Sequence, residues 1–171
     1  MTKDDVLAFL RTQKWAVEAS VSTLGAAQAA LVGVGVTDEL ELVFDTIASS
    51  RKAVNLKANP NAAFVIGGWM AGDERTVQVE GIVDFPLGEV LDRVKAAYFA
   101  VFPDGQSRLT WPGITHARVR PTWIRFSDYR VTPPVIEEFS FDAGPDKFGV
   151  RSEDLTPSFE STSGRSCGSL S

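Results

Sequence analysis

The sequence of 171 residues contains one cysteine, one histidine and no excess of positive charge. Each shortage excludes a class of function. Cys167 has no second cysteine to pair with, so we expect no internal disulfide bond and an incidental thiol. The formal net charge of -5 leaves no basic surface of the kind that nucleic-acid binding requires. We therefore expect no nucleic-acid partner.

Long apolar runs are also missing. The apolar stretch 6–10 is too short, and too soon followed by charge, to act as a signal peptide or a membrane span. We expect a chain that does not enter a membrane and that has a cytoplasmic location.

The common catalytic motifs are missing as well. We find no Ser/His/Asp set, no cluster with metal-ligand spacing and no phosphate-binding P-loop. His116 alternates with apolar positions in a predicted strand, which favours a hydrogen-bonded structural histidine over a ligand or a base. Any reaction is therefore expected to depend on a bound cofactor.

The stretch 40–60 carries the strongest positive signal. Residues 40–46 alternate apolar and polar side chains, as a strand does. Ser49 or Ser50 can then cap a helix that stops near Pro60, so the first turn of this helix carries Arg51 and Lys52.

Cations in the first turn of a helix conflict with its dipole. The conflict costs a few tenths to about 1 kcal/mol unless an anion is bound. A phosphate would accept the free backbone N–H groups, the serine hydroxyl and both Arg51 and Lys52. The alternative is that both side chains extend into water and that Ser50 caps a helix with nothing bound.

The remaining pattern predicts one mainly β domain over residues 1–142. Residues 143–171 are rich in Gly, Ser, Pro and charge and predict a disordered tail. Helices are expected just after Asp5 and over 88–101. Strands are expected over 15–21, 27–36, 40–46, 62–67, 75–85, 114–120, 122–129 and 135–141. This order cannot give alternating parallel units and indicates an antiparallel barrel with helical additions.

Gly33 and Gly35 leave one face of the second predicted strand without side chains. Such glycines mark a bend at a barrel corner or the close approach of a flat ring to the backbone. Both interpretations stay open at this stage.

The order of these motifs resembles the pyridoxamine 5'-phosphate oxidase-like flavoproteins over most of residues 5–140. The resemblance rests on Phe-Asp-Thr, Ser-Arg-Lys-Ala, Asn-Pro, the strand that follows and the polar strand from Arg75. It implies an antiparallel split β-barrel that binds FMN. By position, it assigns the FMN phosphate to Thr46, Ser50, Arg51 and Lys52 and the flavin ring to Thr76 and Gln78.

The resemblance also implies a function and a partner. We expect an FMN-dependent oxidoreductase of unknown substrate, working as a homodimer with flavin sites shared between two barrels. Trp111, on a predicted loop, would shape the substrate side.

The sequence departs from the true oxidase in three places. The family's Arg and Lys are missing from the second strand, Ser127 stands where a Trp is usual, and only Arg130 remains of a substrate-binding pair. We therefore expect a substrate that differs from that of the true oxidase. Three other interpretations stay open: a non-catalytic flavin-binding or stress-related module, a haem-handling relative, and a relative that uses a deazaflavin.

Overall fold

The computed structural model describes residues 1–142, and the expected tail at 143–171 lies outside the described residues. The described chain is mainly β, with three α-helices and one 3-10 helix. Its elements are α1 (Lys3–Arg11), β1 (Trp15–Val21), β2 (Ala27–Gly33), β3 (Gly35–Val36), β4 (Leu42–Ile47), α2 (Arg51–Ala58), β5 (Asn61–Gly67), β6 (Arg75–Asp84), α3 (Gly88–Val101), η1 (Pro103–Thr110), β7 (Ile114–Asp128) and β8 (Val135–Ser140).

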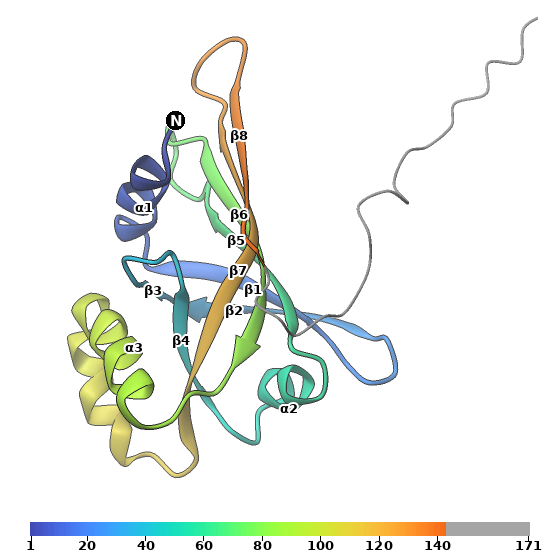
Figure 1. Ribbon diagram of the computed structural model, residues 1–171, viewed down its shortest axis with the longest axis vertical. Helices are drawn as coiled ribbons and strands as arrows, with labels where there is room; N and C mark the ends of the chain where they lie inside the picture. The colour runs from blue at the N-terminus through green and yellow to red at the C-terminus, as the bar shows by residue number, and fades with distance from the viewer. Residues whose placement is uncertain (143–171) are drawn as a thin grey trace, which may run out of the picture.

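The strands form one curled antiparallel sheet in the order β2-β1-β5-β6-β7-β4-β3, with β8 added to β7. This arrangement confirms the predicted antiparallel barrel-like fold. In Figure 1, α2 lies at one end of the curled sheet and α3 lies on its flank. The contacts agree, because α2 packs on β1 and β6 while α3 packs on β3, β4 and β7.

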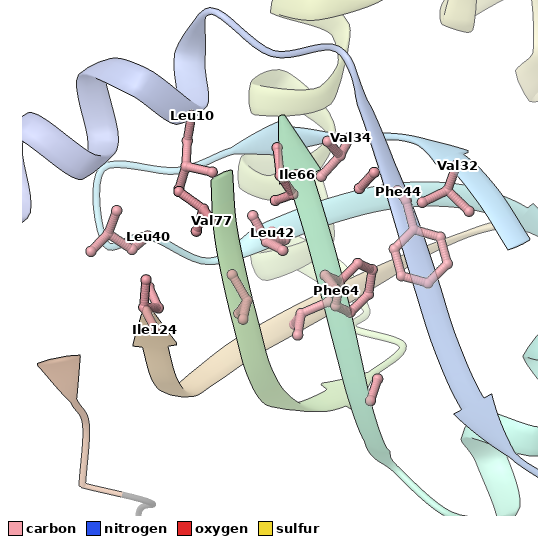
Figure 2. Packing of buried hydrophobic residues seen from close by; sticks show 14 of the residues in the cluster. Leu10, Val32, Val34, Leu40, Leu42, Phe44, Phe64, Ile66, Val77 and Ile124 are labelled. Atoms are coloured by element: carbon pink, nitrogen blue, oxygen red, sulfur yellow. The ribbon is translucent and has the colours of Figure 1, made fainter. Parts of the chain in front are cut away.

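The core fills the inside of the curled sheet. Alternate residues of β5 and β6 point inward, as expected for strands with one buried face. Leu10 of α1 packs into one end of this core (Figure 2). Phe44 and Phe64 meet at its centre, with ring centroids 5.9 Å apart.

Strand β1 is unusual because its polar residues face inward. Ala16, Glu18 and Ser20 are buried, whereas Val17 and Ala19 are half-buried on the outer face. Alternation alone would place the valines inside. The outer surface of β1 is therefore more apolar than a solvent-facing strand requires.

Gly33 and Gly35 lie where the second predicted strand is broken into β2 and β3. A Cβ on Gly35 would lie 2.8 Å from the Ala97 carbonyl oxygen and from the Cα of Tyr98, both in α3. A Cβ on Gly33 would lie 2.8 Å from the Phe102 ring. The glycines thus mark a strand break over which α3 packs closely.

The expected division of residues 114–129 into two strands at Pro121 is wrong. β7 is one strand that pairs with three neighbours: β4, β6 and β8. Its register with β6 shifts between Glu80 and Gly81, so that Pro121 lies opposite Gly81. A bulge at this point removes the need for the N–H that proline lacks.

Candidate functional site

The start of α2 is organised by two hydroxyl side chains. Ser50 is the N-cap, and its Oγ accepts a hydrogen bond of 3.3 Å from the backbone N–H of Ala53. The Thr46 hydroxyl, at the end of β4, lies 2.9 Å from that Oγ. Thr46 is buried, so the structure places it as a support for the Ser50 hydroxyl.

The two predicted cations occupy the first turn of α2. Arg51 is exposed and Lys52 is half-buried, and this turn contains no acidic residue. Within residues 1–142, Arg51 is the only arginine that forms no ion pair. The other described arginines that pair with carboxylates are Arg11, Arg75, Arg93, Arg108, Arg118, Arg120, Arg125 and Arg130.

The backbone at this turn also offers free donors. The first N–H groups of an α-helix have no partner inside the helix. Among the described residues, the N–H groups of Arg51 and Lys52 donate to no acceptor, whereas Ala53 and Val54 donate to Ser50. Free N–H groups, a cap hydroxyl and unpaired cations suit a phosphate group, so these residues fit the phosphate end of FMN.

The predicted ring contacts, Thr76 and Gln78, lie elsewhere. Both belong to β6, and Gln78 is exposed on the outer face of the sheet, opposite Val65. Helix α2 meets β6 near its other end, where the Val83 N–H donates to the Pro60 carbonyl. Helix α2 packs on the inward face of the sheet, where Asn55 donates to Gln28, whereas Gln78 points outward. The phosphate and ring residues of one chain therefore lie on opposite faces of the sheet.

His116 lies beneath α3, and Trp111 lies just beyond η1, the 3-10 helix that packs on α3. Trp111 is exposed and follows the last residue of η1. His116 is 4% exposed, and its ring packs edge-on against Tyr98 and Phe99. Its Nε2 has no hydrogen-bond partner, so packing holds this histidine rather than the hydrogen bonding we expected.

Sequence reasoning missed an ion pair beside His116. The Arg108 Nε donates to Asp45 at 2.9 Å, and the Arg108 Nη2 donates to the Tyr98 hydroxyl at 3.0 Å. No sequence motif joins these residues, which come from β4, η1 and α3. The Arg108–Asp45 ion pair holds η1 against β4 of the sheet.

Glu18 was also missed. It belongs to the inward face of β1 and is fully buried, although an acidic residue in an alternating strand is normally expected on the wet face. Its burial becomes evident only when the folded sheet shows that residues 16, 18 and 20 of β1 face inward.

Two other features of residues 1–142 offer no stronger site. A cavity of about 440 Å³ lies between α1, the β3–β4 turn and α3, but its arginines, Arg11 and Arg93, already pair with the carboxylates around it. In the described part of the chain, no three His, Cys, Asp or Glu side chains gather as metal ligands, and no helix has the length and apolarity of a membrane span.

Comparison with solved structures supports the fold. A haem-binding protein from Mycobacterium smegmatis superposes with a TM-score of 0.69 at 16% identity, covering 80% of this chain and 56% of that one. This chain thus spans little more than half the length of that relative. A pyridoxamine 5'-phosphate oxidase-related, FMN-binding protein from Nostoc punctiforme gives a TM-score of 0.57 at 12% identity, over 80% of this chain and 91% of that one. General stress protein 26 from Bacillus anthracis gives a TM-score of 0.59 at 18% identity, covering 82% of this chain and 100% of that one.

Sequence comparison gives the family directly. No curated protein matches the chain. The sequence model described as pyridoxamine 5'-phosphate oxidase, however, matches residues 2–128, which includes α2 and every strand up to β7. The chain therefore belongs to the pyridoxamine 5'-phosphate oxidase-like family.

Proposed function

We propose that the chain binds FMN, with the flavin phosphate at the start of α2, and acts as a flavin-dependent oxidoreductase. One observation carries the proposal: Arg51 is the one described arginine without a carboxylate partner, and it lies beside free N–H groups in a first turn that lacks acidic residues. The FMN-binding protein from Nostoc punctiforme shares the fold.

Bound flavin supplies the electron or hydride transfer, and the chain supplies position and electrostatics. In this proposal Ser50 donates its hydroxyl hydrogen to the phosphate, and Thr46 orients Ser50. Thr76 and Gln78 form hydrogen bonds with the polar edge of the ring, which tunes its redox potential. Trp111 shapes the substrate side.

The separation of the phosphate and ring residues supports a homodimer with shared flavin sites. Gln78 shares the outer face of the sheet with Val65, Val17 and Leu31, which lie opposite one another across β5, β1 and β2. Leu31 is 63% exposed and Val65 is 43% exposed. A second barrel packed on this face would cover the apolar side chains and bring its own residues to the ring.

Arg51 and Lys52 are the two cations assigned to the flavin phosphate. Replacing both with alanine should weaken FMN binding by about two to four orders of magnitude, because each charge-assisted contact contributes roughly 1.5–3 kcal/mol. Quenching of flavin fluorescence measures the affinity, and circular dichroism checks the fold.

Lys57→Ala is the matched control, since it removes a cation from the last turn of the same helix. It should leave FMN affinity unchanged. A folded Arg51→Ala/Lys52→Ala variant with wild-type affinity would disprove the phosphate assignment. Absorbance of the purified protein distinguishes FMN from a deazaflavin or haem. Haem ligation has little support here, because His116 is buried beneath α3.

A further inference from the structure

Glu18 is buried without the partners that a carboxylate needs. It is 0% exposed, and neither of its carboxylate oxygens has a hydrogen-bond partner. The hydroxyl of Ser20, the next inward residue of β1, also has none. Buried polar groups are nearly always paired, and a buried charge is costly unless it is compensated. These orphaned atoms therefore need an explanation.

Helix α2 covers the face on which Glu18 lies. Ser20 is opposite Gln28 in the β1–β2 ladder, so both side chains point to the same face. The Gln28 Oε1 accepts a hydrogen bond of 3.0 Å from the Asn55 amide of α2. Lys52 precedes Asn55 by three residues and therefore lies on the same stripe of the helix. This explains why Lys52 is half-buried while Arg51 is exposed.

Lys52 is also the cation whose charge acts on Glu18. The flanking strands β2 and β5 carry no titratable side chain, and the other cations of α2, Arg51 and Lys57, are exposed. Burial raises the pKa of the Glu18 carboxyl, and the positive charge of the Lys52 ammonium group opposes the rise. Glu18 and Lys52 form no direct ion pair, and both Glu18 oxygens are without a hydrogen-bond partner, so Lys52 is not committed to this carboxylate.

We propose that Glu18 is a positioning residue of the anion site, which draws Lys52 toward the barrel when it is ionised and frees it for phosphate when it is protonated. This inference rests on the proposed function, because it concerns the same site. It divides the two cations by role. Arg51 is the permanent phosphate contact, and Lys52 is a contact that depends on pH.

Linkage fixes the direction of the effect. A phosphate carries about -1.5 to -2 charges near pH 7, so it competes with the ionised Glu18 for Lys52. Binding of phosphate must then favour the protonated carboxyl, and protonation must strengthen binding by the same factor. Affinity falls as pH rises through the titration of Glu18, about tenfold for each unit by which bound phosphate raises the Glu18 pKa.

The test measures FMN affinity between pH 5 and 9 for the wild type, Glu18→Gln and Glu89→Gln. Glu18→Gln should bind FMN more tightly than the wild type at high pH and should lose the part of the pH dependence that Glu18 causes. The titration of the phosphate itself remains in every variant. Glu89, an exposed acid in α3, is the charge-matched control and should behave as the wild type. Identical pH profiles for the wild type and Glu18→Gln would overturn the proposal.

A second readout does not need flavin. The NMR signal of the Lys52 side chain should shift with pH in the wild-type protein and should lose that shift in Glu18→Gln. Lys52→Met keeps the inference testable if Glu18→Gln does not fold, because loss of the cation should raise the pKa of Glu18 further. The positioning role is refuted if the Lys52 signal shifts with pH equally in the wild type and in Glu18→Gln. Loss of FMN binding with the coupled signal intact refutes only the proposed function.

Discussion

His116 is a buried base between aromatic rings. Burial lowers the pKa of its imidazole, and the nearby Asp45 carboxylate only partly opposes this. The unfolded chain gains a proton on this histidine near pH 6.5, whereas the folded chain resists it. The contribution of His116 to stability is therefore fully present above about pH 6.5 and decreases as the pH falls below that value.

His116→Gln should reduce the loss of unfolding free energy between pH 7.5 and pH 5, as measured by urea denaturation at each pH. Glu18→Gln has the opposite sign. The raised pKa of the Glu18 carboxyl makes the wild type lose stability as pH rises, and the variant should lose less. If His116→Gln and the wild type lose stability equally on acidification, His116 does not titrate as inferred.

At the same scale, the sequence predicts only the local part of the site. Ser50, Arg51 and Lys52 could be found because a cap and the first turn of a helix lie within a few residues of one another. Glu18 could not, since the alternation of β1 favours the opposite phase, with Val17 facing inward. The observed phase places Glu18 on the face that α2 covers, and α2 is more than thirty residues away in the sequence.

At the scale of elements, the docking of α3 depends on Gly35. Gly35→Ala should lower the unfolding free energy by roughly 1–3 kcal/mol, because its Cβ would meet backbone atoms of α3 that cannot turn aside. Gly33→Ala is the matched comparison, since its Cβ would meet the ring of Phe102. Urea denaturation measures both. Equal costs for the two variants would contradict a specific role of the helix backbone.

Strongly patterned elements were predicted closely and irregular ones were not. The ranges 15–21 and 88–101 agree with β1 and α3, because alternation and helical spacing run through both. The connection after Phe102 forms η1, which the sequence indicated only as a loop. Pro121 indicated a strand end, and the bulge that accommodates it becomes evident only when β6 is paired with β7.

The outer face of β1, β2 and β5 is where we expect the proposed dimer to form. Val65→Lys should convert the proposed dimer to a monomer and weaken FMN binding, because a lysine there would place an unpaired charge in the interface. Sedimentation velocity and flavin fluorescence measure the two effects.

Leu24→Lys is the control for added charge. Leu24 is 94% exposed in the turn between β1 and β2, where the fold tolerates a lysine. The Leu24→Lys variant should therefore remain a dimer. A wild-type protein that holds FMN as a monomer at micromolar concentration would refute the shared site.

The pairing of β7 with three other strands also determines when the fold can form during synthesis. β7 is translated after β4 and β6, yet it is the strand that joins them. The sheet therefore cannot be completed until residues 114–128 have left the ribosome. Until then β3 and β4 are separated from the other strands, and the inward apolar side chains of β5 and β6 stay accessible to chaperones.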